Sequence, residues 1–529
     1  MIRLPVLFAG WPGRLAGAAA AVAALAVVLQ VHTAGQTLLA STLLLVTAAA
    51  LWIYSSQRSN ALRYLFPGLA AAAIFVVFPM LYTVAIGFTN YSSLNLLEPA
   101  AARAYLLDQA LPLPGSARDF TLHAQGTQFR LLLAAPEAGG SAWLSPPLDL
   151  PQATVADDAD HAGPKPNTPP LPLLSAASAA SAAADLAPAL PLRAVVQRLP
   201  ALRELRLQTS DGQTLRLAGL RHFAQVQALY AAQADGSFTD QLTGLTYQPD
   251  DSTGFYTSAQ GDRLLPGYRV AVGLRHYASL FSEAKFRQPF VGVLVWTVVF
   301  AALSIVFAAG LGLLLAVLLN WDALQFKAAY RLVLFLPYAV PGFISILIFK
   351  GLFNQNLGEI NFILNGLFGL RPAWFSEPLL AKTMLLIVNV WLGFPYMMVL
   401  CTGLIKSIPV DLYEASAIAG AGPWTNFWRI TLPLIIQPLT PLLISAFAFN
   451  FNNFVLISLL TGGRPDQLDT ALPAGTTDIL VSYTWRIAFQ DSGQQFGLAS
   501  AISTIIFLIV AAITLLQLRL TRVSTAEPQ

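Results

Sequence analysis

Long stretches without a single charged residue recur along this sequence, and they constrain its fold more than any other feature. A helix that crosses a membrane needs about 20 apolar residues, and charged side chains are costly in hydrocarbon. The charge-free runs lie between Arg14 and Arg58, Arg63 and Glu98, Arg287 and Asp322, Arg331 and Lys350, Lys382 and Lys406, Arg429 and Arg464, and Asp491 and Arg519. The first run has room for two helices joined by a turn at residues 32–36. The sequence therefore predicts an all-α polytopic membrane protein with eight transmembrane helices.

The distribution of basic residues predicts the orientation of these helices. Pairs of basic residues fall at alternate ends of the eight predicted spans: Arg3 and Arg14, Arg58 and Arg63, Lys327 and Arg331, Lys406 and Arg429, and Arg519 and Arg522. Because cytoplasmic loops carry the excess of Lys and Arg, we expect these pairs and both termini in the cytoplasm. A secretory signal in the first run is the less favoured alternative, since a second apolar run follows it at once.

Composition argues against several classes of function. The formal net charge is only +3 and the basic residues are scattered, so no nucleic-acid-binding surface is predicted. The single Cys401 excludes an internal disulfide, and the five His residues lie far apart in sequence, so no metal site is expected. No Gly is followed directly by Lys, so the phosphate-binding Walker A pattern is absent. We therefore expect a chain that is not an enzyme and that binds no cofactor itself.

A large hydrophilic insertion interrupts the apolar runs at residues 91–287. It contains 15 of the 30 basic residues and 17 of the 27 acidic residues, which indicates a soluble domain outside the membrane. Residues 205–207 and 214–217 alternate apolar and polar side chains around Asp211-Gly212, a strong hairpin signal. Short strands are also predicted at residues 119–134, 142–150 and 269–272. The insertion is therefore expected to be a β-rich periplasmic domain.

One segment of the insertion, residues 155–191, is rich in Ala, Pro and Ser. Such a composition has too little large apolar surface to order itself, so a flexible loop is predicted. The segment includes Asp157, Asp158, Asp160 and His161, but it lacks the glycine turn and the distal Glu of a calcium loop. We interpret this cluster as a solvated acidic patch.

A loop of a different kind, residues 407–433, joins the sixth and seventh predicted spans on the cytoplasmic side. Asp411 is a candidate cap for a helix that includes Tyr413 and ends near Ile418, and Gly420 and Gly422 permit a sharp turn. A second short helix is predicted at residues 424–430. The expected result is a helix-turn-helix presented to the cytoplasm, with Glu414 exposed.

This loop resembles the EAA loop of the permease subunits of ABC importers. The resemblance is carried by Glu414, Ala415, Ser416, Gly420, Ala421, Ile430, Leu432 and Pro433, with the family's spacing from the Glu to the Leu-Pro pair. Ser416 and Ala419 depart from the family, which usually has Ala and often Asp at these positions. In the family, the loop supplies a coupling helix that docks into a cleft of the ATP-hydrolysing subunit. The alternative interpretation is an ordinary amphipathic loop without a docking role, because such loops between spans are common.

The resemblance extends to the maltose and maltodextrin permease subunits within this family. It is carried from about Thr246 onward by runs such as WTVVFAAL, LPYAVPGFISILIFKGLFNQ, WLGFPYMMVLCTGLIKSIP and FAFNFNNFVLI. It implies a two-helix hairpin at residues 1–65, a third span at 66–90, the β-rich domain at 91–287, and a type I importer core with five helices at 288–529. It also implies a bacterial cell inner membrane as the location.

Polar side chains within two predicted spans suggest where a sugar binds. Planar amides share hydrogen bonds with sugar hydroxyls, and aromatic rings cover the apolar faces of a pyranose. Asn389, Gly393 and Tyr396 are spaced for one helix face, and Asn450 and Asn453 for another. An unpaired amide in hydrocarbon costs several kcal/mol and so needs a partner or a cavity.

The resemblance implies that the family's sugar pocket uses the residues that match Asn389, Leu392, Gly393, Tyr396, Asn450 and Asn453. Ala446 stands where a serine is usual, and one hydrogen bond to the sugar is then missing, unless Ser445 or a water replaces it. The alternative is that these amides only join helices, which is the interpretation we prefer for Asn452.

Three other functions fit the sequence less well. An ion-coupled secondary sugar transporter would need ionisable groups at membrane depth, and Lys350 and Lys382 lie at the ends of predicted spans. A membrane enzyme would need clustered catalytic side chains. A scaffold or receptor would leave the EAA-like loop unexplained. A permease for another glucoside stays open.

The resemblance implies a set of partners. They are a second permease subunit, two ATP-binding subunits that hold ATP and Mg, and a periplasmic sugar-binding protein that delivers maltose or maltodextrin. The lipid bilayer is the remaining partner. ATP hydrolysis is therefore expected on separate polypeptides, with motion passed through the coupling helix as a rigid body.

Overall fold

The computed structural model describes residues 11–55, 60–134, 142–151, 171–173, 186–209, 212–321, 323–468, 470, 472–491 and 493–524. The chain divides into two compact units. One, the membrane unit, comprises Met1–Ser92 and Ala271–Gln529, and the other, the insertion unit, comprises Ser93–Val270. Each is described by itself below.

Three apolar spans open the membrane unit. They are α1 (Trp11–Thr33), α2 (Thr37–Ser55), and a third formed by α3 (Asn60–Ala72), η2 (Ala73–Val77) and α4 (Phe78–Ile86). Gly35 adopts a φ of +80° in the turn between α1 and α2, a conformation that glycine accepts without strain. The predicted turn at residues 32–36 is therefore confirmed.

The remaining helices of the membrane unit follow the insertion. They are α9 (Arg275–Ser282), α10 (Ala284–Asn320), α11 (Lys327–Ala339), α12 (Gly342–Leu352), α13 (Glu359–Phe368), α14 (Pro378–Lys406), α15 (Val410–Ile418), α16 (Pro423–Asn426), η4 (Phe427–Thr431), α17 (Leu432–Phe451), α18 (Phe454–Leu460), α19 (Leu480–Trp485), η5 (Arg486–Gln490) and α20 (Phe496–Ser524). The described residues contain seven helices apolar and long enough to span a membrane, or eight if the bent pair α11 and α12 forms one span. The predicted polytopic helical class is confirmed.

Helix breakers have different effects in two of these spans. The axes of α11 and α12 differ by 91° across Val340 and Pro341, so the fifth predicted span is sharply broken. Proline removes a backbone donor and restricts the residue before it, which explains the break. The sixth span, in contrast, is the uninterrupted helix α14 despite Pro395.

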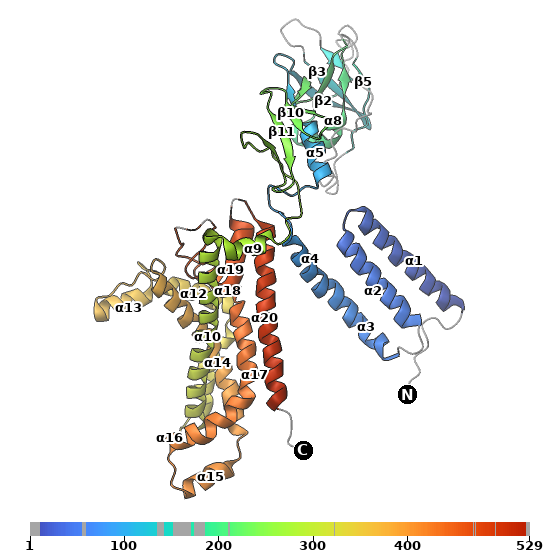
Figure 1. Ribbon diagram of the computed structural model, residues 1–529. Helices are drawn as coiled ribbons and strands as arrows, with labels where there is room; N and C mark the ends of the chain where they lie inside the picture. Colours follow the sequence, from blue (N-terminus) through green and yellow to red (C-terminus); the bar gives the residue numbers. More distant parts are fainter. Residues whose placement is uncertain are drawn as a thin grey trace. The chain divides into compact units, whose positions relative to one another are not determined.

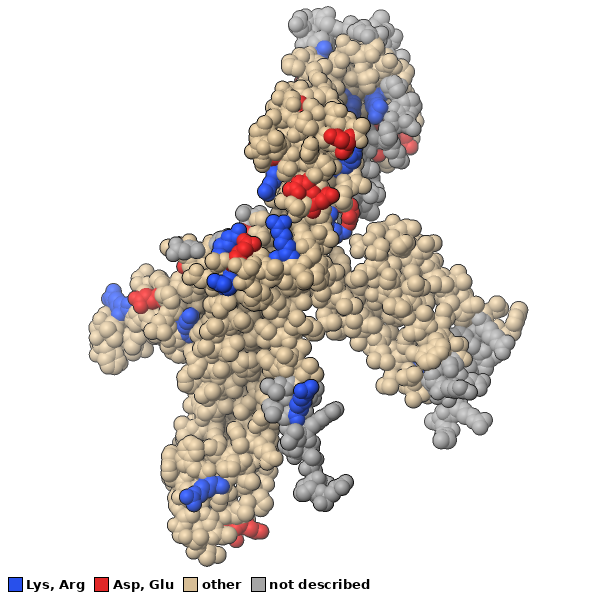
Figure 2. Space-filling model, viewed as in Figure 1, with Lys and Arg blue, Asp and Glu red and all other residues tan. Residues whose placement is uncertain are grey.

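Close packing of α10 against α14 forms the centre of the membrane unit. A Cβ on Gly312 would lie only 2.6 Å from the Cβ of Met397, so glycine lets the two backbones approach. Buried Trp296 and Phe300 of α10 and Val388 of α14 lie in one apolar cluster at another level of the same helix pair. In Figure 2, the helical surface of this unit is almost free of charged atoms between its two ends, as a lipid-facing surface requires.

Two antiparallel-rich sheets build the insertion unit. The first contains β1 (Ala110–Pro112), β2 (Arg118–Gln125), β3 (Gln128–Leu133), β4 (Trp143–Leu144), β5 (Leu171–Pro172), β6 (Leu207–Gln208), β7 (Thr214–Leu217) and β8 (His222–Ala228), in the order β4-β3-β2-β8-β7-β6-β5 with β1 paired to β8. The second contains β9 (Tyr230–Ala232), β10 (Phe238–Asp240), β11 (Thr246–Asp250) and β12 (Phe255–Ser258), in the order β12-β11-β10-β9. In the part of this unit that the structure describes, three short helices accompany the sheets: α5 (Pro99–Asp108), α7 (Leu192–Val196) and α8 (Leu199–Glu204).

Separate apolar cores hold the two sheets. Leu122, Leu131 and Phe223 are buried in the first, and Phe238 and Tyr256 are buried in the second. Burial of one sheet face in each case is typical of antiparallel sheets and explains the alternating pattern along β2 and β3. The predicted β-rich insertion is confirmed.

The individual strand predictions differ in outcome. Leu207 pairs with Leu215 across the predicted hairpin, and Gly212 takes a φ of +78° in its turn. Residues 119–134 form the hairpin of β2 and β3. The strand predicted at 269–272 is wrong: Tyr268 and Ala271 make only isolated bridges, because their partners Leu97 and Thr89 lie in short connecting segments.

Most of the Ala-rich segment predicted to be flexible, and all of the acidic patch within it, lie outside the described residues. Two of its described pieces are attached to the first sheet. Leu171 in β5 pairs in parallel with Leu207, and the backbone N–H of Leu190 donates to the carbonyl of Leu122 at 2.8 Å. In these two pieces, the prediction of a flexible loop is wrong, because backbone pairing replaces the missing apolar surface.

Candidate functional site

Three asparagine side chains meet where the seventh span breaks. Helix α17 ends at Phe451, and α18 begins at Phe454 with Asn453 as its capping residue. The Asn453 side chain accepts from the backbone N–H of Leu456 at 3.4 Å, which satisfies a backbone donor exposed by the break. The break therefore brings Asn450 and Asn453 to the same level of the membrane unit as Asn389 of α14.

The three amides form a continuous hydrogen-bonded chain, which we call the amide cluster (Asn389, Asn450 and Asn453). The Asn389 Nδ2 donates to the Asn450 Oδ1 at 2.7 Å, and the Asn453 Nδ2 donates to the Asn389 Oδ1 at 3.2 Å. The Asn450 Nδ2 donates to the carbonyl of Ala446 at 2.9 Å. Asn389 is buried and lies at the centre of the chain.

The structure places the other predicted sugar-binding residues differently. Leu392 packs in the apolar cluster around Phe300. A Cβ on Gly393 would lie 3.4 Å from the Cβ of Ala308, so this glycine faces α10. The Tyr396 side chain is 42% exposed. A sugar pocket that combines Leu392, Gly393 and Tyr396 with the three amides therefore stays a prediction.

Ala446 stands where the family usually has a serine, and Ser445 is the candidate replacement for it. The Ser445 hydroxyl donates to the carbonyl of Pro441 at 3.0 Å, within its own helix. Ala446 contributes only its backbone carbonyl to the cluster. The Asn452 amide donates to the carbonyl of Ala448 at 3.2 Å and is exposed, as expected for a structural role.

The amide cluster has the chemistry of a polar site that a ligand can open. Each amide offers an acceptor oxygen and two donors, and a sugar hydroxyl both donates and accepts. A hydroxyl that inserts between two amides therefore replaces the bonds it breaks, and the net change in free energy per bond is only about 1 kcal/mol. The cluster can exchange its own bonds for ligand bonds without leaving a polar group unpaired.

The loop of residues 407–433, which we call the cytoplasmic loop after its predicted side of the membrane, forms a compact helical turn. Gly420, with a φ of +78°, ends α15 and reverses the chain toward α16. The Tyr413 hydroxyl lies 2.9 Å from that of Thr431, and the Ser416 hydroxyl hydrogen-bonds the Asn426 amide oxygen. These contacts tie α15 to the start of the following helix, so the loop can move as one rigid piece.

Two details of the loop differ from prediction. Asp411 is in the first turn of α15 but makes no capping hydrogen bond, because the helix begins earlier, at Val410 after Pro409. The second short helix is not separate. Pro423–Phe451 forms one long helix with a π-helical turn at η4, so the loop continues directly into the seventh span.

Several large apolar side chains are exposed on the loop. Ile418 is 90% exposed and Trp424 is 74% exposed, and Leu412 and Trp428 are also exposed. Glu414 is exposed between them on α15. Figure 1 shows α15 and α16 side by side at the end of the helices α14 and α17. An exposed apolar patch around a carboxylate is typical of a protein-docking surface.

A buried ionic cluster lies between α18 and α20, and it was missed from the sequence. The Asp478 carboxylate, fully buried, accepts from Arg486 at 2.8 Å, from the backbone of Gly475 at 2.7 Å and from Ser482 at 2.8 Å. Arg486 also contacts Asp466 at 2.5 Å. Burial disfavours the guanidinium cation, but the two carboxylates outweigh it and raise the pKa of Arg486. Asp478 precedes α19 and Arg486 begins η5, so their spacing in the sequence does not show that the two side chains meet.

Replacing Arg486 by Met is expected to destabilise the membrane unit. The substitution leaves the buried Asp478 carboxylate without its cation, which typically costs about 3 to 5 kcal/mol. Thermal unfolding of the detergent-solubilised protein measures the loss. Arg464→Met is the matched control, because Arg464 is 76% exposed and lies 3.9 Å from Asp466, so its loss is expected to cost at most about 1 kcal/mol. Equal melting temperatures for both variants would contradict this role.

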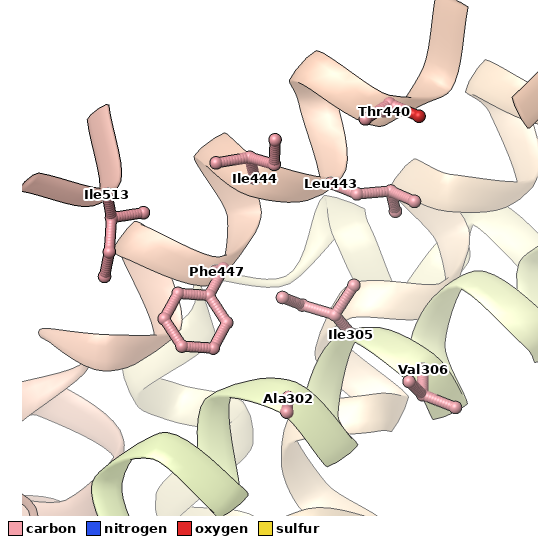
Figure 3. Close-up of a pocket in the computed structure, with 8 residues that line it drawn as sticks. All are labelled: Ala302, Ile305, Val306, Thr440, Leu443, Ile444, Phe447 and Ile513. Carbon is pink, nitrogen blue, oxygen red and sulfur yellow. The ribbon is translucent and has the colours of Figure 1, made fainter. Parts of the chain in front are cut away.

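An apolar cavity of about 350 Å³ lies between α10, α17 and α20. Figure 3 shows side chains from these three helices around it, and they are Ala302, Ile305, Val306, Thr440, Leu443, Ile444, Phe447 and Ile513. It has almost no polar lining, so it does not fit a sugar. Within the described ranges, no group of three or more His, Cys, Asp or Glu side chains is placed to hold a metal ion.

Comparison with known proteins bears on both units. Residues 97–273 match the family described as the maltose transport system permease protein MalF P2 domain, and residues 308–523 match the binding-protein-dependent transport system inner membrane component. These matches cover the insertion unit and the helices that carry the amide cluster and the cytoplasmic loop.

Full-length relatives match almost the whole chain. The maltose/maltodextrin transport system permease protein MalF of Escherichia coli K12 is 44% identical over 510 residues, which cover 94% of this chain and 93% of the relative. The corresponding protein of Klebsiella aerogenes is 46% identical, with coverage of 94% and 93%, and that of Yersinia pestis is 45% identical, with coverage of 93% and 91%. The chain therefore belongs to the MalF family of ABC transporter permease proteins.

Proposed function

We propose that this chain is the membrane-spanning permease subunit of an ABC importer that moves maltose and maltodextrins from the periplasm to the cytoplasm. The observation that carries the proposal is the amide cluster, a set of exchangeable sugar-type hydrogen-bonding groups within the matched permease region. The names of the full-length relatives supply the sugar class. The proposed sugar-binding residues are Asn389, Leu392, Gly393, Tyr396, Asn450 and Asn453.

The proposed energy source is ATP hydrolysis on separate subunits. The cytoplasmic loop presents Glu414 within an exposed apolar surface and continues directly into the helix that bears Asn450. A helix pushed at one end transmits that motion to its other end, because helices move as rigid bodies. The chain itself is proposed to be non-catalytic and to bind no cofactor, with ATP and Mg held by the partners.

The proposed assembly contains a second permease subunit, two ATP-binding subunits and a periplasmic sugar-binding protein. The insertion unit is proposed to lie in the periplasm and to help hold the binding protein, and both chain termini are proposed to lie in the cytoplasm of a bacterium. The alternating positions of Lys and Arg support this orientation.

A screen of glucosides tests the proposal. The chain is purified with its partner subunits in proteoliposomes, and ATP turnover is measured with each binding-protein-loaded sugar. We expect maltose and maltodextrins to stimulate turnover and to be taken up. Stimulation by unrelated sugars alone would assign another substrate, and the absence of stimulation by every sugar would overturn the function.

A permease for a different glucoside is the second candidate. It is favoured by Ala446, which offers the amide cluster a carbonyl but no hydroxyl. Loss of one hydrogen bond to the sugar is worth about 0.5 to 1.5 kcal/mol, enough to change the preferred sugar.

A further inference from the structure

A second cavity, of about 550 Å³, lies within the membrane unit between α4, α18, α19, η5 and α20. Its volume is in the range of small-molecule sites. Five aromatic side chains contribute to its lining, and we call them the aromatic chain: Phe454, Trp485, Phe489, Phe496 and Tyr91. No function discussed so far accounts for this cavity.

Each ring of the aromatic chain contacts the next, from Phe454 to Tyr91. The distances between ring centroids are 5.4 Å for Phe454 and Trp485, 4.3 Å for Trp485 and Phe489, 5.9 Å for Phe489 and Phe496, and 5.3 Å for Phe496 and Tyr91. These distances are typical of packed aromatic pairs. The backbone N–H of Gly497 donates to the carbonyl of Tyr91 at 2.8 Å, which fixes the far end of the chain.

The aromatic chain begins beside the amide cluster. Asn453 caps α18, and Phe454, the first ring of the chain, is the next residue. The same helix start therefore contributes an amide to the cluster and a ring to the cavity. The amide cluster and the ring-lined cavity therefore share the start of α18.

The cavity also has hydroxyl groups among the rings. Thr484, Ser500 and Ser503 line it. The Thr484 hydroxyl donates to the carbonyl of Leu480 at 2.7 Å, and its oxygen keeps acceptor capacity. Among the described residues, the hydroxyls of Ser500 and Ser503 have no hydrogen-bond partner. Rings with interspersed hydroxyls match the alternating apolar faces and polar edges of a pyranose.

Partial exposure distinguishes two rings of the chain from core aromatics. Trp485 is 43% exposed and Phe489 is 52% exposed, although both contact other rings. The competing explanation is an interfacial belt, because Trp and Tyr gather where a span meets the membrane surface. A belt requires no adjacent polar cluster and no lining hydroxyls, whereas a sugar subsite requires both.

We propose that the aromatic chain binds the distal glucosyl units of a maltodextrin whose end is held by the amide cluster. This inference rests on the proposed function and extends it to chain length. Ring faces of Trp485 and Phe489 stack on the apolar faces of successive sugars, and the hydroxyls of Ser500 and Ser503 bond their edges. Maltose, with two units, is held mainly by the amide cluster, and longer chains use both sites.

Uptake of maltose and of maltoheptaose by the reconstituted complex tests the proposal. Trp485→Ala and Phe489→Ala are each expected to lower the efficiency of maltoheptaose uptake about three- to tenfold and to leave maltose uptake within about twofold, as expected for the loss of one stacking contact. Trp485→Phe is expected to restore most of the loss. Phe507→Ala is the matched control, because Phe507 is a 45% exposed ring of α20 that is not part of the cavity.

The outcomes separate this inference from the proposed function. Equal losses for both sugars, or no loss for either, would overturn the subsite and assign the rings to helix packing or an interfacial belt. A wild-type complex that takes up neither sugar would instead overturn the proposed function. Because α19 is short, assembly of each variant with its partner subunits is verified by size-exclusion chromatography. The change in tryptophan fluorescence on adding maltoheptaose, compared between the wild-type and Trp485→Phe complexes, isolates the contribution of Trp485 and supplies a second readout that needs no transport; an equal change in both would contradict the subsite.

Discussion

Glu414→Lys is expected to lower sugar-stimulated ATP hydrolysis by at least about tenfold while the sugar-binding protein keeps its affinity for sugar. Glu414 is exposed on α15 and surrounded by exposed apolar side chains, so the substitution leaves the loop itself folded. On docking, however, it places the opposite charge at the interface, and disrupting a desolvated charge contact costs about 2 to 5 kcal/mol. ATP turnover in proteoliposomes, with and without loaded binding protein, measures the effect.

A charge reversal elsewhere controls for this variant. Glu359, in the first turn of α13, is also exposed and is far from the cytoplasmic loop in sequence. Glu359→Lys makes the same change in net charge and is expected to leave stimulation near the wild-type rate. If Glu414→Lys retained full stimulation in an assembled complex, the loop would not be the docking element.

Asn389→Leu is expected to reduce sugar uptake by about ten- to a hundredfold. Asn389 donates to Asn450 and accepts from Asn453, so its loss leaves both neighbours short of a partner, at about 1 to 3 kcal/mol for each group. Leucine also removes one amide from the proposed sugar contacts. Uptake of radiolabelled maltose measures the loss, and recovery of the intact complex shows whether assembly persists.

Asn452→Leu supplies the matched control for this second prediction. Asn452 is an exposed amide next to the cluster, and its side chain donates to the carbonyl of Ala448 in its own helix. We expect uptake within about twofold of wild type. Asn450→Ala, a smaller change in the same cluster, is expected to lose uptake as Asn389→Leu does. Normal uptake by both cluster variants would remove the amides from the pathway.

Local patterns predicted much of the fold. Absence of charge located the spans, because hydrocarbon excludes charge at every position of a spanning helix. The hairpin at Gly212 was predicted because Asp-Gly between two alternating segments is a specific turn signal. The strands β1 and β8 were missed, since their pairing joins distant segments, such as Ala110 with Ala228, and leaves only a weak signal in each segment. The strands β9 to β12 were missed because each is only three to five residues long, too short for a clear alternating pattern.

Prediction of the candidate site was also partial. Amides in an apolar run were recognisable because hydrocarbon penalises them unless they are paired. Their mutual contacts depend on the break after Phe451, which no residue type announces. Gly393 was assigned to the sugar from spacing and resemblance; a Cβ added there would lie 3.4 Å from the Cβ of Ala308, and its use in the sugar pocket stays a prediction. The ionic cluster of Asp478 and Arg486 and the aromatic chain join segments without periodicity, so sequence patterns could not predict them.

Dependence of uptake on ATP is the most direct test of coupling between the cytoplasmic loop and the amide cluster. The complex is sealed in vesicles with or without ATP at the ATP-binding subunits, and labelled maltose is supplied with the binding protein on the opposite side. The account predicts accumulation only with hydrolysable ATP, and its loss in Glu414→Lys. Accumulation in vesicles that contain this chain but no ATP-hydrolysing subunit would contradict it.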